Sequence, residues 1–144
     1  MRSWEISSLK DISEARGEIR GLAADYGMDV QRVSNFIGCA VEAMANVHKH
    51  AGDGEVTLHT IPDGLMLVAR DAGHGIEALA LPDVALTKGY STAISLGMGY
   101  KVMIEFADRV YLATGPKGTI VAIEMALHAE SSPSDAALSK LTGW

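Results

Sequence analysis

Residues 29–50 carry apolar side chains at helical spacing over the length of a long helix. An α-helix turns by roughly 100° per residue, so residues three or four apart share a face. A face made only of apolar side chains has to be buried against another layer. The apolar face here consists of Val33, Ile37, Ala40, Val41, Met44 and Val47. The stretch therefore predicts an amphipathic helix, with its polar side directed outward.

A second helical pattern precedes this one. Apolar residues recur every three or four positions from 12 to 26, and Gly27 suits the C-terminal cap of that helix. Asp29 is placed to cap the helix that follows. A third helical pattern covers 94–106.

Strands are predicted around these helices. Residues 4–7 are typical of a short first strand, and the runs 55–60 and 65–70 are joined by a Pro-Asp-Gly turn, which predicts a hairpin. The runs 109–113 and 119–127 are joined by a turn containing Gly and Pro, which predicts a second hairpin.

The order of these elements predicts the fold class. Two helices, a hairpin, a helix and a second hairpin favour an α+β fold, a two-layer α/β sandwich with helices on one face of a mixed, mostly antiparallel sheet. The chain has 144 residues, which fits one domain. We expect this domain to cover 1–128, and we expect 129–144 to be a flexible, Ser-rich tail. The glycine-rich stretch 71–92 is expected to be a long loop.

Charge and composition exclude some functions. A formal net charge of −6 argues against a nucleic-acid surface, so any polyanion that binds should be small. The apolar runs are too short to span a bilayer and the first residues lack a signal-peptide core, so a cytoplasmic location is expected. The one cysteine, Cys39, lies in the apolar helix and is expected to be buried.

The polar face of the long helix offers a specific chemistry. Glu42, Asn46 and Lys49 lie within about 40° of one another around the helix. Magnesium keeps several waters, so one carboxamide oxygen from Asn46 together with nucleotide phosphates would hold it. Glu42 would deprotonate a nucleophile, and Lys49 would supply charge to a phosphate. A solvated helix face is the alternative interpretation. His48 and His50 point in different directions and do not predict a metal pair.

Two glycine-rich turns extend this chemistry. The carboxylate of Asp71 can accept a hydrogen bond from the exocyclic amine of adenine, and Gly73 and Gly75 allow the backbone to approach a flat base. Gly97-Met98-Gly99 opens the next helix, where free backbone N–H groups favour phosphate. Thr119 is placed to bond the base edge. Ordinary turn chemistry is the alternative for both turns.

Taken in order, these motifs resemble the ATP-binding signature of the GHKL superfamily. The motifs are Glu42-x-x-x-Asn46-x-x-Lys49-His50-Ala51, Asp71-x-Gly73-x-Gly75, Gly97-x-Gly99 and Gly118-Thr119. Within the superfamily the chain looks most like the bacterial anti-sigma-factor serine/threonine kinases and the RsbT-type switch kinases of stress-response modules. This closer likeness covers nearly the whole chain and includes Asp11-Ile12-x-x-Ala15-Arg16, 87–92 and 97–108. Ser95 and Tyr100 stand where many relatives of this family carry additional glycines.

The resemblance implies a Bergerat-type fold and a set of roles. Glu42 would be the general base that acts on a serine or threonine of a partner, Asn46 would ligate Mg²⁺, and Asp71 would read adenine. ATP and Mg²⁺ would be the cofactors. The implied nucleotide-binding residues are Asn46, Lys49, His50, Asp71, Gly73, Gly75, Ile76, Lys88, Ser91, Thr92, Gly97, Met98, Gly99 and Thr119.

The resemblance also implies partners. A STAS-domain antagonist would be the phosphoacceptor, a sigma factor or a phosphatase would be a further partner, and the chain would form a homodimer. Two functions follow: a protein serine/threonine kinase, or a nucleotide-gated binding module with little phosphotransfer. Glu42 favours the kinase, because a switch without transfer has no need of a base.

Overall fold

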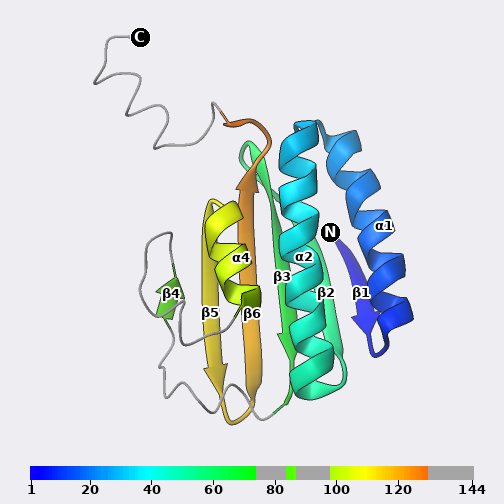
Figure 1. Cartoon of the computed structure of the whole chain (residues 1–144), viewed down its shortest axis with the longest axis vertical. Coiled ribbons are helices and arrows are strands. Elements are labelled where there is room, and N and C mark those ends of the chain that lie inside the picture. The colour runs from blue at the N-terminus through cyan, green and yellow to red at the C-terminus, as the bar shows by residue number, and fades with distance from the viewer. Residues whose placement is uncertain (74–83, 87–97, 130–144) are drawn as a thin grey trace.

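Six strands form one antiparallel sheet in the order β1-β2-β3-β6-β5-β4 (Figure 1). The computed structural model describes residues 1–73, 84–86 and 98–129. The strands are β1 (Arg2–Ile6), β2 (Gly54–Ile61), β3 (Gly64–Asp71), β4 (Val84–Leu86), β5 (Arg109–Gly115) and β6 (Gly118–Ala126). Within these ranges every strand pairing is antiparallel, so the sheet has none of the parallel pairing that a mixed sheet would include.

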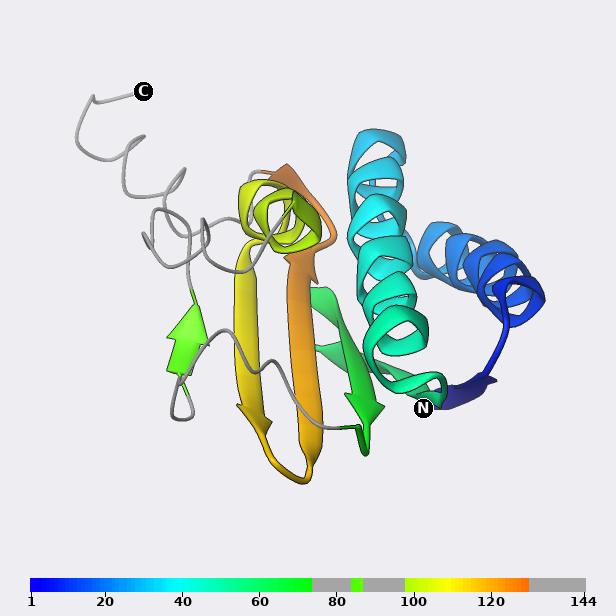
Figure 2. The ribbon, with the colours of Figure 1, turned by 60° about the horizontal axis from the view of Figure 1, so that its bottom comes forward.

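The helices all lie on one face of this sheet, as Figures 1 and 2 show. They are α1 (Leu9–Tyr26), α2 (Val30–Ala51) and α4 (Met98–Phe106). The two-layer α+β sandwich predicted from the order of elements is therefore confirmed. Both predicted hairpins are present, as β2 with β3 and β5 with β6, and the sheet joins them through β3 and β6.

Helix α2 is the centre of the helical layer. It packs against α1 on one side and α4 on the other, and it also contacts β1, β2, β3 and β6. Its buried side chains are Val33, Phe36, Ile37, Cys39, Ala40, Ala43, Met44 and Val47, which confirms the predicted apolar face and the burial of the cysteine. Val41 is only partly buried.

The polar face of α2 differs from the prediction. Lys49 is exposed as expected, but Glu42 and Asn46 are half-buried. The reason is α4, which packs on α2 next to these two side chains. The pattern of α2 alone gives no indication of which later helix will cover it.

The caps at the junction of α1 and α2 are only partly as predicted. Gly27 adopts the left-handed conformation with φ 103° and ends α1. Asp29 occupies the N-cap position of α2 but makes no side-chain capping bond. Its backbone N–H donates to the carbonyl oxygen of Leu127, which brings His128 within 2.8 Å of the Asp29 carboxylate. The carboxylate therefore binds a side chain beyond β6 instead of the first turn of α2.

One strand was not predicted. β4 lies inside the stretch 71–92, which was expected to be a loop, and pairs with the outer edge of β5. Three residues are too few to show strand alternation, so pairing with β5 is what defines this strand. The predicted start of the third helix, 94–97, lies outside the described residues, as does the expected tail from 130 onward.

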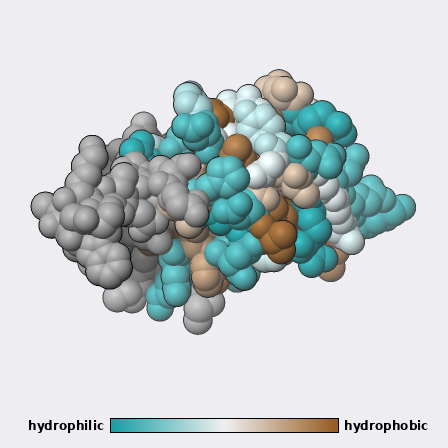
Figure 3. Space-filling view, turned by 90° about the horizontal axis from the view of Figure 1, so that it is seen from above, coloured by the Kyte–Doolittle hydropathy of each residue, from teal (hydrophilic) through white to brown (hydrophobic). Residues whose placement is uncertain are grey.

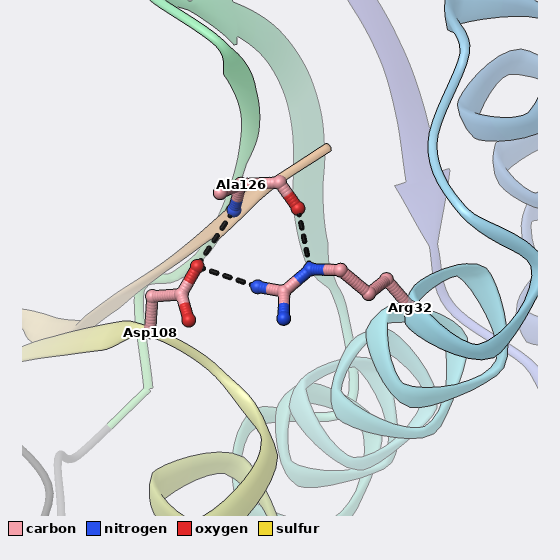
Figure 4. Close-up of polar contacts among 3 residues, drawn as sticks. All are labelled: Arg32, Asp108 and Ala126. Carbon is pink, nitrogen blue, oxygen red and sulfur yellow. Dashed lines mark hydrogen bonds and ion pairs between the residues drawn. The ribbon is translucent and has the colours of Figure 1, made fainter. Parts of the chain in front are cut away.

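A charged contact joins the first turn of α2 to the end of β6 and to the segment between α4 and β5 (Figure 4). The Arg32 guanidinium donates from Nε to the Ala126 carbonyl oxygen over 2.7 Å and from Nη2 to the Asp108 carboxylate over 2.6 Å. The same carboxylate oxygen accepts the Ala126 backbone N–H at 2.7 Å. Asp108 lies between α4 and β5, so this contact joins α2, α4 and the end of β6.

The described surface seen from above is mostly hydrophilic, with apolar side chains in small groups (Figure 3). Among the helices that the structure describes, none combines the length and apolar character needed to cross a membrane.

Replacement of Arg32 by alanine tests the importance of this contact. The Arg32 and Asp108 side chains are only 15% and 26% exposed, so the variant leaves a poorly solvated carboxylate without its cation. We expect Arg32→Ala to lower the free energy of unfolding in urea by about 2 kcal/mol. Arg20→Ala is the control, since Arg20 is exposed and has no ion-pair partner among the described residues, and it should change stability by less than about 0.5 kcal/mol. Equal losses in both variants would show that the contact does not stabilise the fold.

Candidate functional site

A small cavity lies between the helical layer and the sheet. It has a volume of about 10 Å³, which is room for about one water molecule. Its walls come from α2, β3, α4 and β6. The lining residues are Ala43, Asn46, Val47, His50, Ala69, Asp71, Tyr100, Thr119 and Val121. The fold therefore brings together Asn46, His50, Asp71 and Thr119, which the sequence assigned to one site.

Asp71 ends β3 at the wall of this cavity and pairs in the sheet with Thr119 of β6. Its Oδ1 accepts the Gly73 backbone N–H at 3.0 Å, which holds the carboxylate in place. The Thr119 hydroxyl lies 2.9 Å from the hydroxyl of Thr114 and the residue is 6% exposed. The cavity thus presents an oriented carboxylate and a hydroxyl, groups that can bond the edge of a base.

Gly118 makes this arrangement sterically possible. It has φ 138°, and a Cβ at this position would lie 2.0 Å from the Asp71 carbonyl oxygen. Any larger residue would push the ends of β3 and β6 apart. The Gly118-Thr119 pair of the motif therefore shapes the same wall of the cavity as Asp71.

Asn46 carries an unsatisfied polar group. Of the buried side-chain nitrogens and oxygens in the described ranges, its Nδ2 is the one without a hydrogen-bond partner. A buried polar group without a partner costs about 1–3 kcal/mol. Rotation of the Asn46 carboxamide by half a turn exchanges the positions of its nitrogen and its oxygen. The oxygen would then occupy the position without a partner and could bind a cation that is itself bound to phosphate. Asn46 therefore fits the role of a magnesium ligand.

Gly99 brings the first turn of α4 against this part of α2. A Cβ at Gly99 would lie 2.9 Å from Oε2 of Glu42 and 3.4 Å from Nδ2 of Asn46. Only glycine allows so close an approach without a shift of the polar side chains. The first N–H groups of a helix have no partner within it and favour anions. A phosphate at this turn would therefore lie next to Asn46 and Glu42.

Glu42 faces a second space, a groove of about 520 Å³ between α1 and α2. The groove is lined by Leu9, Ile12, Ser13, Arg16, Arg20, Ser34, Ile37, Gly38, Val41 and Glu42. In the described part of the chain the Glu42 carboxylate has no hydrogen bond or ion pair. Burial, and to a smaller extent the charge of Glu42, raise the pKa of the neighbouring Cys39 thiol to about 12.

The other predicted site residues lie partly around the cavity and partly outside the described ranges. Gly73 holds Asp71, and Lys49 is exposed on α2 and lines neither the cavity nor the groove. Met98 begins α4. Gly75, Ile76, Lys88, Ser91, Thr92 and Gly97 lie outside the described residues.

Five residues of the cavity wall were not predicted. They are Ala43, Val47, Ala69, Tyr100 and Val121. Tyr100 is the informative one, because it belongs to the buried face of α4 with Met103 and Ile104, a face that the buried Ala107 continues just beyond the helix. The spacing of these residues shows that face in the sequence, whereas the position of Tyr100 in the same cavity wall as Asp71 depends on the tertiary fold.

The comparison with solved structures supports this arrangement of the fold. The histidine kinase domain of the blue-light activated histidine kinase EL346 from Erythrobacter litoralis matches with a TM-score of 0.53 at 17% sequence identity. The match covers 88% of this chain and 64% of that chain, so the present chain spans less than two thirds of its length. At this identity the likeness shows the fold alone. No curated protein matches the sequence.

The comparison with protein families is more direct. The model of the histidine kinase-like ATPase domain matches residues 7–125, which cover every wall of the cavity and of the groove. It begins before α1 and ends within β6. The chain thus belongs to the histidine kinase-like ATPase domain family, a GHKL-type fold.

Proposed function

We propose that the protein is an ATP-dependent serine/threonine kinase of a bacterial partner-switching module, and that it phosphorylates a STAS-domain antagonist. The observation that supports this most is the position of Glu42. Its carboxylate lies beside the first turn of α4 together with Asn46, and it also lines the groove between α1 and α2. A base in this position can reach both a phosphate at α4 and a hydroxyl brought in through the groove.

The nucleotide would take up the cavity and its rim. The adenine amine would donate to Asp71, with Thr119 at the base edge, and the phosphates would extend toward the N–H groups of α4. Asn46 would hold Mg²⁺ through its carboxamide oxygen. When bound, that ion supplies positive charge that offsets the charge on the phosphates.

Glu42 would act on the incoming hydroxyl. As the serine or threonine oxygen forms its bond to the γ-phosphorus, Glu42 takes the hydroxyl proton, and the bond between the γ-phosphorus and the β,γ-bridging oxygen breaks to release ADP. The catalytic contribution of the protein is then positioning and charge placement.

The groove between α1 and α2 supports docking of a protein substrate. Its floor is apolar, with Ile12 and Ile37, and its rim carries Arg16 and Arg20, which have no ion-pair partner among the described residues. Two unpaired guanidinium groups beside an apolar floor favour a segment that combines acidic and apolar side chains. Such a partner suits a kinase that carries a net charge of −6, because the positive charge lies where the partner would dock.

A nucleotide-gated binding module is the second candidate. The groove and the cavity lie on opposite sides of α2, so a sigma factor or a phosphatase can dock in the groove without contact with the cavity in which adenine would bind. Phosphotransfer separates the two candidates, since only the kinase uses Glu42 as a base.

The first prediction of this function concerns nucleotide binding. Asn46→Ala should lower the affinity for ATP at least about tenfold in the presence of Mg²⁺ and change it little without the ion, measured by calorimetric titration. Asn35→Ala on the same helix is the matched control and should bind as the unmodified chain does. Magnesium-dependent affinity that survives Asn46→Ala would remove the assigned metal ligand.

Asp71→Asn should reduce the preference for ATP over GTP, because a carboxamide can also donate to the guanine carbonyl.

The second prediction concerns transfer. Glu42→Gln keeps the shape of the side chain and removes its basicity, so ATP affinity should stay within about twofold while the rate of phosphate transfer to a STAS-domain protein falls roughly 10²- to 10⁴-fold. The measurement is incorporation of γ-labelled phosphate into the partner. Glu14→Gln, on the exposed face of α1, serves as the control. Undiminished transfer by Glu42→Gln would exclude its role as the base.

The third prediction concerns the groove. Arg16→Glu should raise the KM for the protein substrate about tenfold or more, because it replaces attraction by repulsion, and should leave the Kd for ATP unchanged. Steady-state kinetics with varied partner concentration would measure this. Arg109→Glu, on β5, makes the same charge change away from the groove and should have no such effect. Equal effects of the two substitutions would point to net charge instead of docking in the groove.

A further inference from the structure

A row of three polar residues crosses the end of the sheet beside the cavity. Thr119 belongs to β6, which lies between β3 and β5 (Figure 1). It pairs with Asp71 of β3 on one side and with Thr114 of β5 on the other. Residues directly opposite one another in antiparallel strands carry their side chains on the same face. The next pair on this face, Val121 with Leu112, is buried, so the row faces the helical layer.

Thr114 adjoins Thr119 without being part of the cavity wall. Thr119 is buried and lines the cavity, whereas Thr114 does not line it. The two hydroxyl oxygens are 2.9 Å apart, and either hydroxyl can be the donor. The direction of this hydrogen bond determines what Thr119 presents to a ligand. If Thr114 donates, the Thr119 proton is left for the ligand, and if Thr119 donates, the ligand meets only its lone pairs.

The edge of adenine requires the first of these two directions. This edge carries an amine that donates and, next to it, the ring nitrogen N1, which accepts. The carboxylate of Asp71 can only accept, so it suits the amine. Thr119, its neighbour in the row, must then donate in order to bond N1. A base with a carbonyl and an N1–H group at the same edge has the reverse requirement.

We propose that Thr114 is a positioning residue for base recognition, whose hydroxyl donates to the Thr119 oxygen and so leaves the Thr119 proton to bond N1 of adenine. This inference rests on the proposed nucleotide function and deepens it, because it assigns part of the choice of base to a residue outside the cavity wall. Asp71 and Thr119 then form a matched acceptor and donor. The alternative is a threonine pair that only stabilises the hairpin of β5 and β6.

Calorimetric titration of the full chain with two nucleotides in the presence of Mg²⁺ tests this. ATP is compared with 1-deaza-ATP, in which a C–H group replaces N1 and the amine is kept. The unmodified chain should bind ATP about tenfold more tightly, which is the size of effect that one hydrogen bond between neutral groups allows. In Thr114→Val, which keeps the shape of the side chain, this ratio should fall to about threefold or less, because the Thr119 hydroxyl is no longer held in one direction.

Three further variants separate positioning from support of the fold. Thr114→Ser keeps the hydroxyl and should keep the ratio of the unmodified chain. Thr60→Val makes the matched change at an exposed position of β2 and should also keep it. Thr119→Val removes the hydroxyl that would bond N1, so ATP and 1-deaza-ATP should then bind with similar affinity. Circular dichroism checks that each variant is folded, and Thr114→Ala replaces Thr114→Val if the latter does not fold.

The remaining outcomes contradict the inference in distinguishable ways. A ratio in Thr114→Val that equals or exceeds that of the unmodified chain would overturn it, because Thr114 would then not direct the Thr119 proton to N1. An equal loss of affinity for both nucleotides would overturn it as well and leave Thr114 as a support of the hairpin. Equal binding of ATP and 1-deaza-ATP by the unmodified chain would contradict recognition of N1 alone. Absence of binding of either nucleotide by the unmodified chain would contradict the proposed nucleotide function itself.

Discussion

The position of helix α2 is the constraint on which the rest of the structure depends. Its apolar side is buried against α1, α4 and the sheet, and the guanidinium of Arg32 holds its first turn to Asp108 and to the end of β6. Asp108 also accepts the backbone N–H of Ala126, so one carboxylate joins the start of α2 to two other elements. Burial determines which side of the helix faces the sheet, whereas this directional contact helps to set where the helix lies along it. The placement of Asn46 and Glu42 beside Gly99 follows from that position.

Helix α2 is also the shared wall of two spaces with different chemistry. On the side of α4 it closes a small cavity that holds a carboxylate, a hydroxyl and a phenol, and on the side of α1 it forms an open groove bordered by arginines. One turn of helix separates Glu42, which faces the groove, from Asn46, which faces the cavity. A rigid element between two binding spaces allows reacting groups to be held at fixed separation without a contribution from a mobile loop.

Much of this arrangement could be predicted from the sequence, because it depends on periodicity and on glycine. The spacing of apolar residues gave α1, α2 and both hairpins, and the glycine-bearing motifs identified Asp71, Gly99 and Gly118, where the backbone approaches other groups closely. Contacts between distant segments could not be predicted in this way. The half-burial of Glu42 and Asn46 depends on α4, the contact of Asp29 with His128 depends on where β6 ends, and β4 depends on the free edge of β5. Tyr100 belonged to a visible helical pattern, but its place in the same cavity wall as Asp71 is a property of the tertiary fold.

The cavity is assembled from four segments that are far apart in the chain, since Asn46, Asp71, Tyr100 and Thr119 come from α2, β3, α4 and β6. No short piece of the chain contains it, so an unfolded molecule offers a ligand nothing comparable. Binding and folding are therefore thermodynamically linked, and a ligand present at about 1,000 times its Kd would add about 4 kcal/mol to the stability of the whole domain. In a cell, the supply of that ligand would then influence how long each copy of the protein survives unfolding and proteolysis.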